Sequence, residues 1–235
     1  MVSVINRYGL RASFHLNSSR LGTDGFLDPS ELSSLFSSHE IAAHTINHPN
    51  LCDLSRDMII EEVSGDIESL SDLAGYRVRG FSYPFGAYND IVLQTLTEID
   101  IAYARSDRST VRFDLPTDFM CWDPTCHHSC NLVDMAHSFK ALDSYEPCLF
   151  YIWGHSYEFH NEDNWVIMDE FGRLVGNDPA IWYATGIEIY DYMKAFRRLD
   201  NSPDNKRVSN PTQSRIWILF NDKTVELMPG GSLRL

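Results

Sequence analysis

Side chains that can bind a metal ion are concentrated in the stretch HEIAAHTINH, residues 39–48. His44 and His48 are four residues apart, and on a helical turn or a tight loop this spacing lets both imidazoles face one ion. His39 and Glu40 do not complete the H-E-x-x-H motif of zinc proteases, because the next histidine comes one position too late. Hydrogen-bonded histidines that only stabilise the loop are an equally good interpretation of this spacing taken alone.

Two further motifs follow apolar segments that have strand character. Tyr83, Pro84 and Phe85 form a turn after VRGFS, and His155 comes directly after FYIWG. Barrel enzymes take their catalytic side chains from the carboxyl ends of parallel strands. Together with the loop that contains His44, these motifs predict a functional site at one rim of such a fold.

The stretch CWDPTCHHSC, residues 121–130, leaves several interpretations open. Its cysteines fit one half of a structural zinc site, but a second cysteine pair is missing. His127 and His128 are candidates to line a substrate groove, or they are loop histidines with satisfied hydrogen bonds. Trp122 is a candidate to stack on a sugar ring, with core packing as the alternative. Glu158 is a candidate to bind a sugar hydroxyl or to orient a neighbouring histidine, with a solvated carboxylate as the alternative.

The elements that position these residues alternate between strand and helix. Capping residues and apolar periodicity mark the helices, as Ser55 and Gly75 do at the two ends of 55–75. We predict helices at 1–9, 28–39, 55–75, 89–100, 132–143, 163–175 and 186–199, and strands at 12–16, 40–46, 78–83, 101–106 and 148–156. This alternation predicts a parallel α/β sheet or barrel.

The end of the chain has a different pattern. Residues 200–213 are typical of a polar linker, and residues 214–231 contain two apolar strand segments around Asn221 and Asp222. Asparagine and aspartate at this position are a hairpin signal. We therefore predict an α/β barrel domain over residues 1–200, and a linker with a small β-hairpin appendage over residues 201–235.

The bulk properties exclude some classes of function. The chain has 235 residues, 43% of them hydrophobic, and a formal net charge of -14. This length and composition support one sizeable core, and the negative charge disfavours binding to nucleic acid. No apolar run is long enough for a membrane span, and the first residues are too short and polar for a signal peptide. The five scattered cysteines favour a reducing compartment and a cytoplasmic location, although a longer native form would allow secretion.

Taken in order, the motifs resemble those of the polysaccharide deacetylase family, the NodB-type carbohydrate esterases. The segment HTINH resembles the family's H-[ST]-x-x-H motif, which implies a divalent metal ion, zinc above all, bound by His44 and His48. The segment FSYPFG resembles the third motif and implies that the Phe85 backbone N–H helps to hold the oxyanion. The segment IWGHSYEF resembles the L-x-H motif and implies that His155 is the general acid. The resemblance covers most of residues 8–200 and implies a distorted (β/α) barrel.

The chain also departs from the family pattern. The T-F-D-D-G motif, which supplies a metal-binding aspartate and the general base, is not recognisable, and Ser82 stands where the third motif has an arginine. We therefore expect a barrel without its first strand, a weakly held metal ion, and weak or absent activity in this chain. A start codon misplaced inside a longer enzyme is the favoured explanation, and a shortened pseudoenzyme is the other.

The resemblance implies metal-dependent removal of acetyl groups, chiefly N-acetyl groups, from a carbohydrate. A non-catalytic carbohydrate-binding protein or scaffold is the alternative function. A carbohydrate substrate is the expected partner, and a homodimer that seals the open barrel edge is a further expectation. The residues expected to line the substrate site are Tyr83, Pro84, Trp122, His127, His128 and Glu158.

Overall fold

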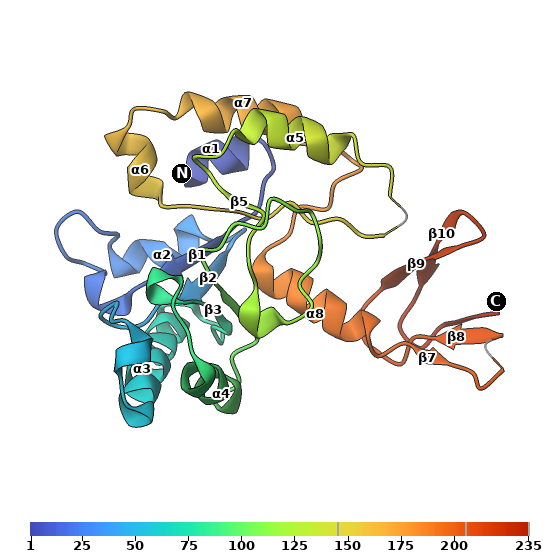
Figure 1. The fold of residues 1–235 in the computed structure, drawn as a ribbon, viewed down its shortest axis with the longest axis horizontal. Helices are drawn as coiled ribbons and strands as arrows, with labels where there is room; N and C mark the ends of the chain where they lie inside the picture. The colour runs from blue at the N-terminus through green and yellow to red at the C-terminus, as the bar shows by residue number, and fades with distance from the viewer. Residues whose placement is uncertain (145, 205, 235) are drawn as a thin grey trace. The chain divides into compact units, whose positions relative to one another are not determined.

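The computed structural model describes residues 1–144, 146–204 and 206–234 (Figure 1). The chain forms two compact units, Met1–Ile187 and Glu188–Leu235. The division falls inside helix α8, Gly186–Phe196, before residue 200, where the sequence pattern placed the boundary. Among the described residues, no helix combines the length and the hydropathy that crossing a membrane requires.

A parallel sheet forms the centre of the first unit. Its four strands lie in chain order: β1 (Ser13–Leu16), β2 (Glu40–Ala43), β3 (Gly80–Ser82) and β4 (Tyr103–Arg105). Phe14 of β1 lies beside Ile41 of β2 in the register. Every residue of β2 and β3 is buried, as expected for central strands with covered faces. The predicted parallel α/β architecture is confirmed.

The parallel arrangement continues beyond β4. An isolated parallel bridge joins Arg105 to Trp122, and the chain then enters β5 (Cys126–His127), which pairs in parallel with β6 (Ile152–Trp153). Because these strands all run in one direction, their carboxyl ends lie at the same rim of the fold.

Two helices cover one side of the sheet. Helix α3 (Arg56–Ala74) begins at Ser55, whose side chain accepts a hydrogen bond from the Met58 backbone N–H, and it ends at Gly75 in a left-handed conformation. Helix α4 (Asp90–Glu98) begins at Asn89 in the same way. Helix α3 packs on β2 and on α4, and buries an apolar stripe that includes Ile59, Val63 and Leu70. Both helices were predicted from these caps.

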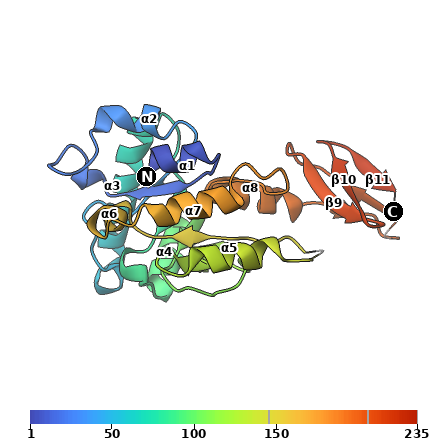
Figure 2. The same ribbon diagram turned by 90° about the horizontal axis from the view of Figure 1, so that it is seen from above.

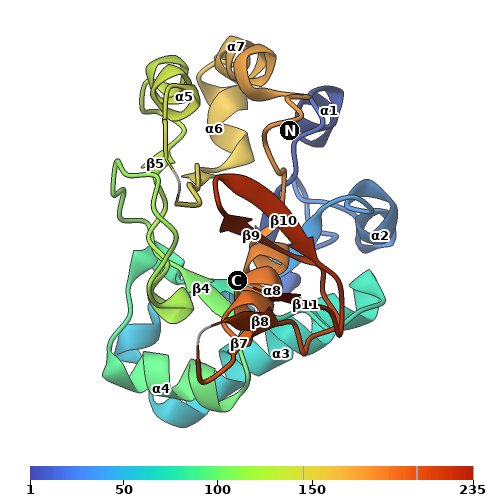
Figure 3. The same cartoon turned by 90° about the vertical axis from the view of Figure 1, so that its right-hand side faces the viewer.

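The remaining helices of the first unit lie mainly on the other side. Figure 3 shows α5, α6, α7 and α1 away from α3 and α4. Their bounds are α1 Val2–Arg7, α2 Leu32–Leu35, α5 Leu132–Lys140, α6 Ser156–Asn161 and α7 Val166–Val175. Helices α5 and α7 pack together over a second apolar cluster that includes Phe159 and Phe171. Short 3-10 turns occur at Ser18–Arg20, Pro29–Glu31, Leu51–Asp53, Pro84–Gly86 and Phe119–Cys121.

The second unit contains short antiparallel strands, gathered together in Figure 2. They are β7 Asp200–Asn201, β8 Arg207–Ser209, β9 Ile216–Phe220, β10 Lys223–Leu227 and β11 Ser232–Arg234. Strands β9 and β10 form the predicted hairpin around Asn221 and Asp222, both at positive φ. The prediction of a plain polar linker at 200–213 is wrong, because β7 and β8 lie in it and β8 pairs with β11. The buried core here includes Val208, Ile216 and Leu227.

Candidate functional site

Side chains with catalytic chemistry gather where the parallel strands end. His44 follows β2, Phe85 follows β3 after a short turn, and His155 follows β6. The ring centroids of His44 and His48 are 4.7 Å apart, and those of His48 and Phe85 are also 4.7 Å apart. Burial lowers the pKa of both His44 and His48, and the nearness of His155 lowers the two pKa values further. The three imidazoles therefore share one rim.

His44 is held in one orientation and in its neutral form. Its Nδ1 lies 2.8 Å from the Ser82 carbonyl oxygen, so Nδ1–H donates there and the lone pair is on Nε2. Burial lowers the pKa of His44 to about 3. Its backbone N–H donates to Asp66 Oδ2 at 2.9 Å, and Asp66 on α3 is fully buried. The side chain is thus a preoriented nitrogen donor at neutral pH.

The loop between His44 and His48 is fixed by strained backbone and by side-chain hydrogen bonds. Thr45 and His48 have φ values of 71° and 60°, in the left-handed region that most residues avoid. The Thr45 hydroxyl accepts the His48 backbone N–H at 2.9 Å. The Asn17 side-chain amide donates to the carbonyl oxygens of His44 and Thr45. Strained positions of this kind persist where surrounding contacts over-determine them, and they cluster at functional sites.

The turn after β3 is also strained. Phe85 has a φ of 58° and its side chain is 65% exposed. The next residue, Gly86, has a φ of 62°, and a Cβ there would clash with the Asp107 carboxylate. Glycine is therefore required at this position, and the turn presents the Phe85 ring to the edge of His48.

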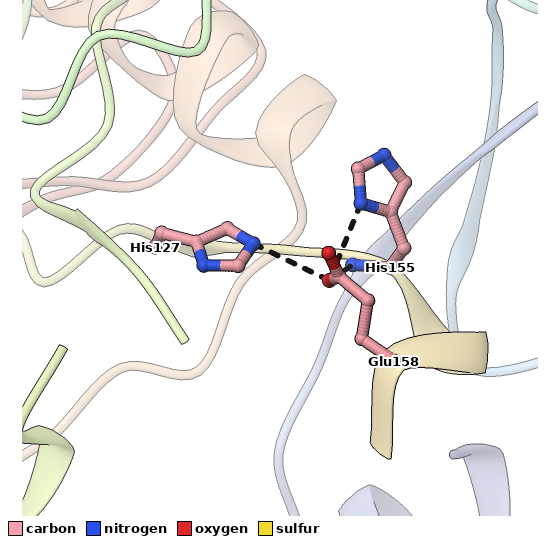
Figure 4. A group of neighbouring side chains, drawn as sticks. All are labelled: His127, His155 and Glu158. Atoms are coloured by element: carbon pink, nitrogen blue, oxygen red, sulfur yellow. Dashed lines mark hydrogen bonds and ion pairs between the residues drawn. The ribbon is translucent and has the colours of Figure 1, made fainter. Parts of the chain in front are cut away.

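A second group of donors meets at the ends of β5 and β6 (Figure 4). Glu158 Oε2 lies 3.3 Å from His127 Nε2 and 3.3 Å from His155 Nδ1, as the dashed lines show. It also accepts the His155 backbone N–H at 2.9 Å. Burial raises the pKa of Glu158, but the hydrogen bond from the His155 N–H and the nearness of His155 and His127 outweigh it, so that the pKa lies below its usual range.

Four of the predicted substrate-binding residues are buried: Tyr83, Pro84, Trp122 and His128. Trp122 packs edge-on against Tyr103, and its side chain is 2% exposed, so that it cannot stack on a sugar ring. The Tyr83 hydroxyl donates to the Met120 carbonyl oxygen. Burial gives no support to direct substrate contact by these four side chains, because the motif fixed where each residue lies along the chain and not which way its side chain points. His127 and Glu158 remain partly exposed at the rim.

Two residues at the rim were not singled out from the sequence. His15 on β1 and Arg105 at the end of β4 are enclosed by the fold, and burial lowers the pKa of each. The Arg105 guanidinium lies over the Trp153 ring at 4.7 Å and donates to the Ser106 carbonyl oxygen. The rule that led to His44 and His155, a polar residue at the end of an apolar strand, would have found Arg105, which ends β4, but not His15, which lies inside β1.

Two donor sets could therefore hold a metal ion. One is the pair of His44 and His48. The other is His127, His155 and Glu158, whose ligand atoms all lie within 4.8 Å of one another. Within residues 1–144, 146–204 and 206–234 this is the one group of three or more such donors, and it contains no cysteine. The alternative of a structural zinc site on the cysteines of 121–130 thus gains no support.

Comparison with known proteins finds similarity to one family. The family model described as polysaccharide deacetylase matches residues 1–104, which include His44, His48 and Phe85. A curated relative from Arthroderma benhamiae, described as "Probable peptidoglycan-N-acetylglucosamine deacetylase", is 25% identical over 118 residues. That match covers 50% of this chain, and the chain spans only 27% of the relative's length.

Solved structures agree in fold. A "putative polysaccharide deacetylase" from Mycobacterium smegmatis is 16% identical, with a TM-score of 0.60 over 83% of this chain and 76% of the other. The Xyl-CE4 domain of a multidomain xylanase from the hindgut metagenome of Trinervitermes trinervoides is also 16% identical, with a TM-score of 0.53 over 83% of each chain. At this identity the likeness shows the fold, a distorted α/β barrel, which is the fold that the sequence pattern predicted. The matched family model, the curated relative and the shared fold agree in their direction: the chain is similar to polysaccharide deacetylases over residues 1–104 and shares their fold.

Proposed function

We propose that this chain is a deacetylase domain that removes N-acetyl groups from a carbohydrate with the help of a divalent metal ion held by His44 and His48. The observation that carries the proposal is the neutral, preoriented His44 beside His48, at a rim shared with His155. Similarity to polysaccharide deacetylases over residues 1–104 suggests the reaction class. The name of the curated relative, a peptidoglycan-N-acetylglucosamine deacetylase, supports an N-acetylated sugar as the substrate.

His44 and His48 fit a metal ion, with zinc as our first choice. A metal-binding imidazole usually donates its other ring N–H to a carbonyl or carboxylate oxygen, and His44 donates to Ser82 in this way. A bound ion supplies a polarised carbonyl and an activated water molecule. Catalytic zinc normally has three protein ligands, and in the described part of the chain no carboxylate forms an ion pair with either ring. We therefore expect weak binding at this pair.

His155 is our candidate for the general acid. When protonated on both nitrogens, it can donate one proton to the leaving nitrogen as the C–N bond breaks, which gives a free amine and acetate. Glu158 Oε2, 3.3 Å from His155 Nδ1, stabilises the second proton and orients the ring. The Phe85 backbone N–H is our candidate for holding the developing oxyanion. Since we recognise no general base in this sequence, we expect slow turnover.

Exposed aromatic rings at this rim are better candidates for sugar contact than Trp122. Phe85 and Tyr157 are 65% and 58% exposed, and the Tyr157 ring stacks on His155 at 5.1 Å between centroids. The faces of sugar rings carry C–H groups, which pack well against aromatic surfaces. We infer that these two rings, together with His127, line the substrate groove.

The proposal extends to a homodimer. Among the strands that the structure describes, β1 pairs on one side only, with β2. An open strand edge is a template for pairing with another chain, so a second copy could cover it. Light scattering of the purified chain tests this part of the proposal.

The test of the function is acetate release from N-acetylglucosamine oligomers by the purified chain, with zinc or cobalt added or removed. We expect slow, metal-dependent release that His44→Ala and His155→Ala both abolish, while His160→Ala on the exposed side of α6 leaves it unchanged. O-acetylated xylan in a parallel assay distinguishes amide from ester substrates. Release that is indifferent to metal and to His44→Ala would contradict the proposal.

The absence of a recognised base favours one second candidate, a carbohydrate-binding protein without catalysis. Calorimetric titration with the same oligomers distinguishes the two functions. Binding of the oligomers without acetate release under any metal condition would support the second candidate and exclude the first.

A further inference from the structure

We propose that His127, His155 and Glu158 form a second divalent metal site, separate from the His44–His48 pair, and that an ion bound there prevents His155 from acting as the general acid. The existence of the site stands on geometry alone. Its inhibitory effect rests on the function proposed above.

The distances suit a tetrahedral metal ion. Ligand atoms about 2.0 to 2.1 Å from a tetrahedral zinc ion lie roughly 3.3 Å from one another. Glu158 Oε2 lies 3.3 Å from His127 Nε2 and 3.3 Å from His155 Nδ1. All three atoms lie within 4.8 Å of one another, so only the edge between the two histidines has to shorten, and rotation of a half-exposed His155 side chain can provide this.

Regular structure positions all three ligands. His127 ends β5 and lies beside Trp153 of β6 in the parallel register. His155 follows β6 after one residue and precedes α6, and Glu158 lies in the first turn of that helix. The His155 backbone N–H donates to Glu158 Oε2 at 2.9 Å, which fixes the carboxylate toward the histidines (Figure 4). The donors are therefore brought together before any ion arrives.

The surrounding side chains support this arrangement. Ser129 holds the His127 ring, because its backbone N–H donates to Nδ1 at 3.3 Å and its Oγ lies 2.8 Å from the same nitrogen, so that Nε2 faces Glu158 Oε2. His128 is 3% exposed, and its Nδ1 lies 3.4 Å from Glu158 Oε2 without forming a hydrogen bond. Gly154 allows this approach, because a Cβ there would clash with the His128 ring. A buried nitrogen without a hydrogen-bond partner thus lies close to the same carboxylate.

The donor set determines the class of ion. Two imidazole nitrogens and one carboxylate oxygen suit zinc and its transition-metal neighbours, whereas magnesium and calcium prefer oxygen ligands. The side chains of His127, His155 and Glu158 are 21%, 44% and 24% exposed. An ion from solution can therefore reach the site, and a fourth position stays open for water.

An ion at this site changes the chemistry of His155. A general acid of the imidazolium type must carry protons on both ring nitrogens. A metal ion on Nδ1 occupies the position of one proton, so the ring can no longer be an imidazolium. Its Nε2–H is then too weak an acid to protonate a leaving nitrogen. Excess metal should therefore inhibit the enzyme even though metal at His44 and His48 activates it.

The test is a titration of the purified chain with cobalt(II), read by its visible absorption, which is strong for tetrahedral coordination. We expect two bound equivalents in the unaltered chain and in the His160→Gln control on the same helix. In Glu158→Gln, in His127→Gln and in His44→Ala we expect only one equivalent of cobalt to bind as tightly as in the unaltered chain. The affinity of the altered site for cobalt should fall at least about tenfold. Glutamine at 158 keeps an oxygen that accepts the His155 N–H, and His127→Gln leaves α6 unaltered, so that folding is preserved in both.

The outcomes separate this site from the first one. If Glu158→Gln and His127→Gln both still bind two equivalents of cobalt with unchanged affinity, the proposal of a second metal site is overturned. Loss of all cobalt in His44→Ala would overturn it too. Retention of both equivalents in His44→Ala, with loss only in Glu158→Gln and His127→Gln, would instead contradict the metal pair of the proposed function. Where acetate release is measurable, half-inhibition should need at least about ten times more zinc in His127→Gln.

Discussion

Replacement of His44 by asparagine should remove a specific part of the acid sensitivity of the fold. Asparagine can still donate a side-chain N–H to the Ser82 carbonyl oxygen, which His44 Nδ1 contacts at 2.8 Å. It cannot take up a proton. The variant therefore keeps the local hydrogen bond and removes the titration.

The magnitude follows from the pKa of His44. Burial lowers this pKa from 6.5 to about 3, so the unfolded chain takes up a proton in a pH range where the folded chain does not. The stabilisation is fully present above pH 6.5 and is lost progressively as the pH falls toward 3. Between about pH 7.5 and about pH 5, His44 should lower the free energy of unfolding by about 2 kcal/mol.

The assay is urea unfolding of the metal-free chain in the presence of a chelator, at several pH values across this range. We expect the free energy of unfolding to fall by about 2 kcal/mol more in the unaltered chain than in His44→Asn. His160→Asn, at an exposed position on α6, should behave like the unaltered chain. Parallel pH profiles for the unaltered chain and His44→Asn would refute the buried, neutral state of this imidazole.

Three further substitutions test the packing around the site and in the second unit. Gly80→Ala would place a Cβ 2.5 Å from the Tyr103 hydroxyl and should destabilise by about 1 to 3 kcal/mol; an unchanged melting temperature would contradict this. Tyr83→Phe removes the bond to the Met120 carbonyl oxygen, 2.8 Å away, and should lower the urea midpoint by an amount equal to about 1 kcal/mol. Asn210→Ala removes a buried amide that donates to two backbone carbonyls at 2.8 and 2.9 Å, and should speed amide exchange across residues 207–228 through a loss of about 2 kcal/mol. Exchange that stays slow there would show that these bonds contribute little.

Local signals in the sequence were enough to place most elements of the first unit. Ser55 and Asn89 begin helices because their side chains accept backbone N–H groups that the first turn leaves unpaired. Gly75 ends a helix because it takes the left-handed conformation without steric cost. Helix α6 was missed because it is short, and β7 and β8 because polar strand segments resemble a linker.

The family motifs, the order of most strands and helices of the first unit, and the positions of His44, His48 and His155 after apolar strand segments could all be predicted from the sequence alone. These depend on neighbours within a few residues, so local chemistry is sufficient. The burial of Trp122 and His128 became evident only from the folded chain. Only the tertiary structure shows that His127 and His155, separated by 28 positions in the chain, converge on one carboxylate. The reason is physical: a strand end fixes the rim on which a residue lies, but its burial and its partners depend on side chains that come from distant segments.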